Sequence, residues 1–143
     1  MSMLHLLTSS TKITKVASAA TSAGTAINSD AVDMSGFEGV VFLGTIATAN
    51  AGNFANAAQG DTSGGSFADL AGTAVSPGDD ADSFCIEVYR PTDRWVRCEI
   101  DRSGTNTATG DIYAFQYGAR TVPVTHGSTI DSEQHVSPDE GTA

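Results

Sequence analysis

The residues best suited to catalysis in this sequence are three histidines near the two ends of the chain, His5, His126 and His135. Histidine is the side chain that most readily acts as a general base or metal ligand near neutral pH. Distance along the chain does not prevent a triad from assembling in space. However, there is no Gly-x-Ser-x-Gly elbow, and neither cysteine has the local signature of a catalytic nucleophile. We therefore expect surface or arm histidines and a protein that is not an enzyme.

The two cysteines, Cys85 and Cys98, are too few for a disulfide scaffold and lack the spacing of a zinc site. They lie in two alternating segments on either side of the turn Pro91-Thr92-Asp93. If these segments paired as a hairpin, Ile86 would face Cys98 and Cys85 would face Glu99. The two thiols would then lie on opposite faces of the sheet, so we expect both to be free.

The acidic run Asp79-Asp80-Ala81-Asp82 offers the hard oxygen ligands that calcium takes. It lacks the Asp-x-Asp-x-Asp-Gly spacing of a calcium loop, and we interpret it as a solvated turn. Gly64-Gly65 is not followed by the Gly-Lys-Ser/Thr of a phosphate-binding loop. We expect no metal and no cofactor.

A basic and aromatic cluster is the strongest candidate for a binding site. Four of the seven Lys and Arg residues lie between residues 90 and 102, beside Tyr89 and Trp95. These four are Arg90, Arg94, Arg97 and Arg102. Trp, Tyr and Arg anchor protein interfaces more often than other residues. The alternative is cross-strand pairing of the arginines with Glu87, Glu99 and Asp101.

The charge balance limits the choice of partner. Seven Lys and Arg against 17 Asp and Glu give a net charge of −10, which argues against binding to nucleic acid or to a membrane surface. A basic partner, or solubility alone, suits this charge better. The apolar runs are too short to span a membrane, and the first residues lack the cationic region of a signal peptide. These features predict a soluble protein made in a cytoplasm.

Strand signals dominate the rest of the chain. The run 37–46 is dense in β-branched and aromatic residues, which predicts a strand covered on both faces. The Gly-rich turn 60–65 predicts a hairpin, and a second hairpin is expected around Pro91-Thr92-Asp93. The segment 14–26 has no apolar stripe and is expected to be extended or a loop. The expected strands are 4–8, 11–17, 37–46, 53–59, 66–70, 83–90, 94–101 and 111–117.

Many short strands separated by turn signals predict an all-β fold, an antiparallel β-sandwich of jelly-roll-like form with extended N- and C-terminal arms. We expect one domain in three parts. Residues 1–36 would form N-terminal strands and an extended connector, 37–117 the sandwich core, and 118–143 an extended C-terminal arm.

The C-terminal arm begins where strand alternation stops, at Tyr117. Gly118 frees the backbone there, and Pro123 and Pro138 disfavour a central strand. We expect residues after about Val124 to be ordered only where they lie on a neighbouring subunit or on a larger assembly that the protein binds. The residues expected to contact partners are Tyr89, Arg90, Arg94, Trp95, Arg97, Arg120, Val122, Val124, Ile130 and Val136.

A set of short segments spread across residues 37–143 is distinctive when taken together. These segments are Tyr89-Arg90-Pro91, Arg94-Trp95-Val96-Arg97, Phe115-Gln116-Tyr117-Gly118-Ala119-Arg120, Pro123-Val124-Thr125, Ser66-Phe67-Ala68-Asp69-Leu70-Ala71-Gly72-Thr73 and Ser137-Pro138-Asp139-Glu140-Gly141-Thr142-Ala143. Together they resemble a family of small tailed-bacteriophage virion proteins of the capsid cement or decoration class.

This resemblance implies a structural protein on the capsid exterior that binds and stabilises the shell of major capsid protein. It also implies self-association as a homo-dimer or homo-trimer, and it implies no catalytic residues. Two alternatives remain open. One is a head–tail connector, tail or fibre component, and the other is a carbohydrate-binding β-sandwich that uses Trp95 and Tyr89 as a stacking platform.

Overall fold

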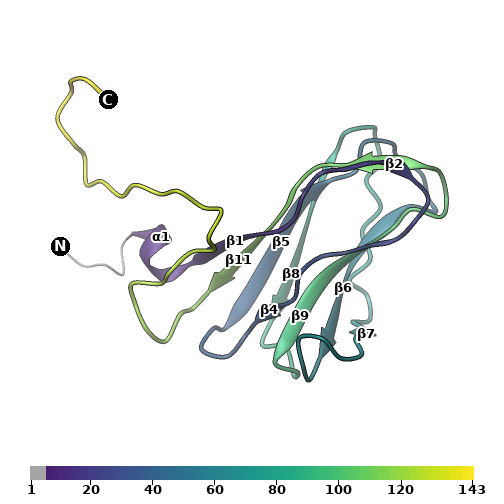
Figure 1. Cartoon of the computed structure of the whole chain (residues 1–143), viewed down its shortest axis with the longest axis horizontal. Helices are drawn as coiled ribbons and strands as arrows, with labels where there is room; N and C mark the ends of the chain where they lie inside the picture. The colour runs from purple at the N-terminus through teal and green to yellow at the C-terminus, as the bar shows by residue number, and fades with distance from the viewer. Residues whose placement is uncertain (1–5) are drawn as a thin grey trace.

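A computed structural model describes residues 6–143 of the chain (Figure 1). It contains one short helical turn, α1 (Leu7–Ser10), and eleven strands within these residues. The strands are β1 (Lys12–Ala17), β2 (Ala20–Ala23), β3 (Ile27–Asn28), β4 (Val32–Asp33), β5 (Gly39–Thr45), β6 (Phe54–Gly60), β7 (Ala68–Asp69), β8 (Ser83–Tyr89), β9 (Trp95–Asp101), β10 (Thr107–Thr109) and β11 (Ile112–Tyr117).

The strands form two facing antiparallel sheets. The first, called here the β5 sheet, has the order β1-β11-β5-β8. The second, the β9 sheet, has the order β3-β9-β6-β7, with β4 also paired to β9. A separate two-stranded ribbon, β10 with β2, lies at one end (Figure 1). The predicted all-β antiparallel sandwich is therefore confirmed.

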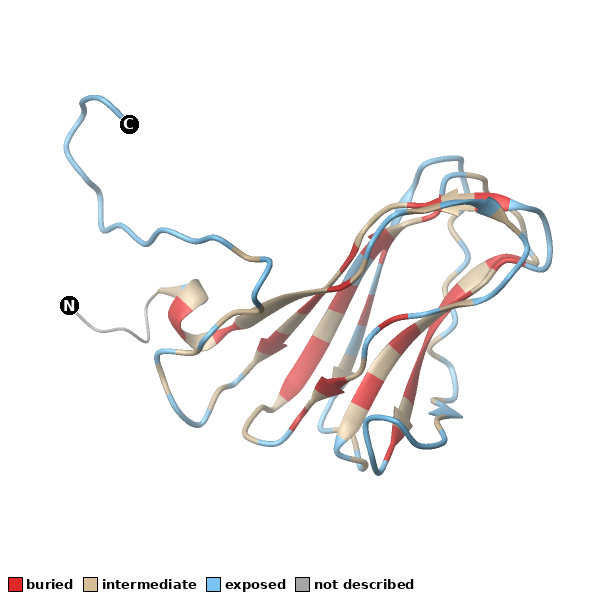
Figure 2. Cartoon of the chain, viewed as in Figure 1, coloured by how far each residue is buried: buried red, intermediate tan, exposed pale blue. Residues whose placement is uncertain are grey.

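The core lies between the inner faces of the two sheets (Figure 2). Phe42 of β5 and Ile86 of β8 pack from one side, while Val96 and Ile100 of β9 pack from the other, and each is at most 4% exposed. Ala55 and Ala57 of β6 are fully buried as well. Each large apolar side chain that is buried in this way stabilises the fold by about 1.5–3 kcal/mol.

The expected hairpin between β8 and β9 is wrong, although the alternation of both strands is correct. Strand β8 pairs with β5, and β9 pairs with β6, so the two strands belong to different sheets. The turn after Tyr89 carries the chain across the end of the sandwich. The inward residues of β8 and β9 therefore lie on opposite sides of one core. This arrangement buries the apolar faces of both strands against each other, which a hairpin of the two strands within one sheet would not do.

Both thiols are free, as expected, but the register used to infer this is wrong. Cys85 is exposed on the outer face of the β5 sheet, and Cys98 is buried on the inner face of the β9 sheet.

Two other local predictions have opposite outcomes. The hairpin around the Gly-rich turn is confirmed, since Ala58 pairs with Asp69 and Gln59 with Ala68. The expected strand 4–8 is wrong where the structure describes it, because residues 7–10 form a helical turn closed by a bond from Thr11 N–H to the Leu7 carbonyl. Five residues are too few for alternation to distinguish a turn from a strand. Residues 4 and 5 of that prediction, including His5, lie outside the described residues.

The segment predicted to be covered on both faces has only one face in the core. Phe42 is fully buried, but Leu43, the next residue of β5, is 40% exposed. Within the described residues, nothing covers Leu43 as the pattern predicted. The N-terminal part of the chain joins both sheets, with β1 in the β5 sheet and β3 and β4 against β9.

The C-terminal segment contains no strand or helix after Tyr117. The expectation that residues after about Val124 are ordered only on another molecule is wrong for the start of this segment, which is bonded to the body of the same chain. Val124 N–H donates to the Ser9 carbonyl, and Gly127 N–H donates to the Ile13 carbonyl. Residues 131–143 are all exposed and lead away from the sandwich (Figures 1 and 2), and Gln134 Nε2 donates to the Thr8 hydroxyl on α1 at 2.8 Å. Among residues 6–143, no helix is long and apolar enough to cross a membrane.

Candidate functional site

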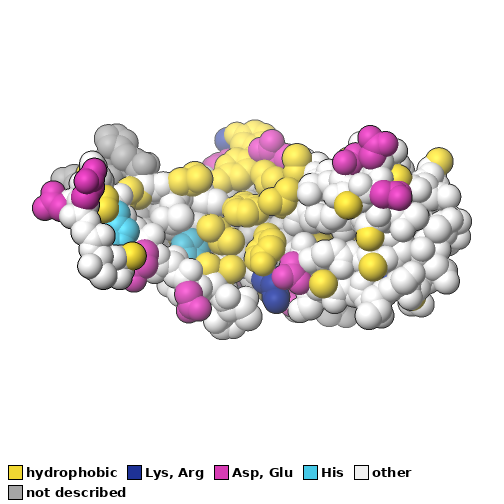
Figure 3. All heavy atoms as spheres, turned by 90° about the horizontal axis from the view of Figure 1, so that it is seen from above, with side chains coloured by type: hydrophobic (Ala, Val, Ile, Leu, Met, Phe, Trp, Pro, Cys, Tyr) yellow, Lys and Arg dark blue, Asp and Glu magenta, His cyan; other side chains and the backbone are white. Residues whose placement is uncertain are grey.

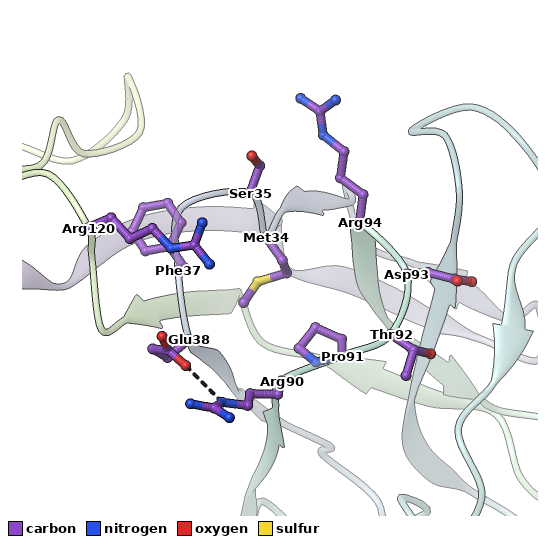
Figure 4. Close-up of a pocket in the computed structure, with 10 residues that line it drawn as sticks. All are labelled: Met34, Ser35, Phe37, Glu38, Arg90, Pro91, Thr92, Asp93, Arg94 and Arg120. Carbon is purple, nitrogen blue, oxygen red and sulfur yellow. Dashed lines mark hydrogen bonds and ion pairs between the residues drawn. The ribbon is translucent and has the colours of Figure 1, made fainter.

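The turn between β8 and β9 lines an open pocket at one end of the sandwich, with a volume of about 490 Å³ (Figure 4). We call it the arginine pocket. Its lining residues come from the turn, from the segment before β5 and from the segment after β11. They are Met34, Ser35, Phe37, Glu38, Arg90, Pro91, Thr92, Asp93, Arg94 and Arg120.

Arg90 forms one wall of the pocket and is held by Glu38. Its backbone N–H donates to the Glu38 carbonyl at 2.8 Å, and its Nε donates to Glu38 Oε2 at 3.0 Å (Figure 4). Arg90 has a φ of 52°, a left-handed conformation that is uncommon for a residue with a side chain. Its guanidinium lies 5.2 Å from the centre of the Tyr89 ring.

Arg94 lies across the pocket and makes a bidentate ion pair with Asp33. Its Nε and Nη2 donate to the two carboxylate oxygens at 2.9 and 2.8 Å. This geometry is the strongest that an arginine makes with a carboxylate. The bond from Arg94 lowers the pKa of the Asp33 carboxyl below its usual value, although partial burial acts in the opposite direction. The pair fixes the segment before β5 to the start of β9.

Arg120 differs from the other two arginines of the pocket. Its backbone N–H donates to the Gly36 carbonyl, which holds the chain after β11 against the pocket. Its guanidinium makes no ion pair with any of residues 6–143. The arginine pocket therefore offers one uncommitted cation beside two neutralised ones, an arrangement suited to an acidic side chain of a partner.

The structure separates the other members of the predicted basic cluster. Arg97 lies on the outer face of the β9 sheet, where its Nε donates to Glu99 at 2.7 Å and its guanidinium stacks 4.2 Å from the Phe67 ring centre. Arg102 is 5% exposed and donates to three backbone carbonyls near the β10–β2 ribbon. Arg97 is thus paired along its own strand, and Arg102 is a structural clamp.

The two aromatic residues of the predicted cluster lie on opposite sides of the sandwich. Tyr89, the last residue of β8, is 60% exposed and points outward from the β5 sheet, like Cys85 and Glu87. Trp95, the first residue of β9, points outward from the β9 sheet, and the Arg94 guanidinium lies 5.6 Å from its ring centre. They do not form one stacking platform.

The apolar residues expected in the C-terminal arm divide into two groups. Val122, Val124 and Ile130 are partly buried where the arm follows the body. Val136 is 63% exposed.

The remaining candidates for chemistry have local structural roles. His126 Nδ1 accepts a bond from Ile13 N–H at 3.0 Å, and His135 lies 3.6 Å from Glu133. In the acidic run, Asp80 accepts from Ala49 N–H and Asp82 accepts from Asp79 N–H, so these carboxylates cap turns. Within the described part of the chain, no group of three or more His, Cys, Asp or Glu could hold a metal ion.

Sequence reasoning missed two features. The first is the pair of carboxylates that hold the pocket arginines, Asp33 with Arg94 and Glu38 with Arg90. They lie far from the arginines in sequence, and no local sequence pattern predicts these pairs. The second feature is the apolar outer face of the β5 sheet, visible as hydrophobic side chains gathered in the middle of Figure 3. The signal for this face was available, since the run 37–46 is apolar on both faces.

No protein-family model matches this chain, and no curated protein matches it significantly.

Proposed function

We propose that the protein is a non-enzymatic structural component of a tailed-phage particle, a cement or decoration protein that binds the outside of the major capsid protein shell. In this role it self-associates as a dimer or trimer and stabilises the shell. The proposal rests on the resemblance of residues 37–143 to such virion proteins and on the surfaces that the sandwich leaves open.

The observation that carries the proposal is the exposed end of the C-terminal arm. Residues 131–143 are exposed throughout and include Val136, an apolar side chain with little cover. Ordering an extended segment costs about 1–2 kcal/mol per residue. A segment of this kind gains that energy back when it lies along a neighbouring molecule, which is how an arm strengthens a coat without a second core.

The arginine pocket supplies a second attachment point in this proposal. Arg120 has a free guanidinium at an open end of the molecule, beside exposed Arg90 and Arg94. A carboxylate of the major capsid protein would pair with Arg120 through charge-assisted hydrogen bonds. This contact also directs attachment to one end of a protein whose net charge is −10.

A carbohydrate-binding function is supported less well, because Trp95 and Tyr89 lie on opposite outer faces. A connector, tail or fibre component would use the same arm, and copy number in the particle separates that alternative from a cement protein.

The test is binding to purified capsids that lack this protein. Deletion of residues 131–143 removes only exposed residues, so the sandwich should fold normally while capsid binding weakens at least tenfold. The matched control replaces the same residues with a Gly/Ser segment of equal length, which keeps the length and removes the side chains. Undiminished binding by both variants, with a normal far-ultraviolet circular dichroism spectrum, would contradict the role of the arm.

A further inference from the structure

The outer face of the β5 sheet is unusually apolar for a surface. We define the apolar face as Ile13, Val41, Leu43, Tyr113, Phe115 and Tyr117, which come from three neighbouring strands. In the sheet register, Ile13 lies beside Phe115 and Phe115 beside Val41, while Tyr113 lies beside Leu43. Figure 3 shows hydrophobic side chains gathered in the middle of one face of the molecule.

The apolar face differs from what a solvated sheet requires. Antiparallel sheets with one face in water alternate apolar residues inward and polar residues outward. The outward residues of β9 follow this rule, since Arg97 and Glu99 form an ion pair there. In the middle of the β5 sheet the outward residues are aliphatic and aromatic instead, and polar Thr45 lies only at the end of β5. A strand with this sequence is usually covered on both sides. Within the described chain, only the inner side of β5 and β11 is covered, by the β9 sheet.

We propose that a second copy of this chain provides the missing cover, with the two β5 sheets packed face to face about a two-fold axis parallel to their strands. The inference deepens the self-association in the proposed function by assigning it to the apolar face. A two-fold contact uses the same patch on both copies and closes after two subunits.

The charges at the margins of the apolar face select this axis. Lys15 lies on β1, beside Tyr113, and Glu87 lies on β8, beside Val41. Within one copy, Lys15 Nζ lies 3.9 Å from Asp111 Oδ2, and Glu87 accepts a hydrogen bond from the Tyr117 hydroxyl, so a contact with the second copy would be made in addition to these. An axis along the strands places β1 of one copy over β8 of the other. Lys15 then lies about two residues, or roughly 7 Å along the strand, from Glu87 of the second copy, which a lysine side chain spans. An axis across the strands would instead bring Lys15 near Lys15.

The size of the face predicts a reversible dimer. The whole β5 sheet, with four strands about 4.8 Å apart and about five residues long, presents roughly 300 Å² per copy, and the apolar face is its larger part. A standard stable interface buries about 800 Å² per partner, so this contact belongs to the weak end. We therefore expect dimerisation to depend on concentration in solution and to be favoured by the high local concentration on a particle.

The test is sedimentation equilibrium of the full-length protein over about 1–500 µM, without capsids. We expect a monomer–dimer equilibrium that Leu43→Lys weakens at least tenfold, because the variant buries a charge in the interface. Leu7→Lys is the matched control, since Leu7 is 73% exposed on α1 and lies outside the apolar face. Circular dichroism and thermal unfolding verify that both variants are folded.

A charge exchange tests the orientation. Lys15→Glu and Glu87→Lys should each weaken the dimer, and the double variant should recover most of the affinity. Cys85 reports on the alternative in which two β8 edges pair side by side. The face-to-face dimer keeps the two Cys85 thiols apart, whereas edge pairing brings them close enough to form a disulfide under mild oxidation.

The inference is overturned if the protein is a monomer throughout, if Leu43→Lys dimerises normally, or if the dimer links rapidly through Cys85. Capsid binding is measured separately on the same samples. A wild-type dimer that fails to bind capsids contradicts the cement function and supports the interface. A monomer that binds capsids supports the cement function and contradicts the proposed interface.

Discussion

Strands β8 and β9 have the same alternation, yet their outward sides differ. The outward side of β9 is completed by the chain itself, because Arg97 pairs with Glu99 and stacks on Phe67. The outward side of β8 adjoins the apolar face and leaves Cys85, Glu87 and Tyr89 exposed. The chain therefore satisfies the outer face of the β9 sheet with its own ion pair and stacking contact, and it leaves the apolar outer face of the β5 sheet uncovered. An uncovered apolar face indicates a surface for another molecule.

The largest effect is expected from comparing the two sides of β5. Phe42→Ala removes a fully buried ring and should lower the free energy of unfolding by about 3–5 kcal/mol. Leu43→Ala, at the adjacent exposed position, should lower it by less than about 1 kcal/mol at concentrations where the protein is monomeric. Urea unfolding followed by circular dichroism measures both. A similar loss for the two variants would show that the outer face is part of the core.

A second expected difference concerns the two thiols. Burial raises the pKa of the Cys98 thiol to about 12, with a smaller contribution from the negative charge of Glu99. Cys85 is exposed. At pH 8, a thiol reagent should therefore modify one cysteine quickly in the folded protein and the second only on unfolding, since the thiolate is the reactive form. Rapid modification of both would mean that the β9 sheet opens readily.

These contrasts show which features the sequence could predict. The hairpin of β6 and β7 follows from its Gly-rich turn, and the inward residues of β8 and β9 follow from their alternation. The pairing of β8 with β5 does not, because alternation identifies a face and says nothing about which strand lies alongside. For the same reason, proximity along the chain groups Arg90, Arg94, Arg97 and Arg102, whereas the structure keeps only the first two together at the arginine pocket. The carboxylates that hold these two, Glu38 and Asp33, come from a segment some 50 to 60 residues earlier.

The smallest effect is expected at the arginine pocket. The ion pair with Arg94 lowers the pKa of Asp33 in the folded state, so the pair contributes stability above the unfolded pKa of about 3.9. That contribution is lost as the pH falls below about 4 and Asp33 becomes protonated. Because both side chains are more than one-third exposed, the contribution should be below about 1 kcal/mol. Asp33→Asn should flatten the acid limb of a stability-against-pH curve, and an unchanged limb would show that the pair is open in solution.

The most direct test of the cement function is the number of copies of this protein per particle, measured by quantitative denaturing gel electrophoresis against the major capsid protein. A protein that coats the shell should be present in hundreds of copies, in a simple ratio to the major capsid protein. About a dozen copies or fewer would place the protein at the head–tail junction, the tail or a fibre, and absence from purified particles would contradict a virion role altogether.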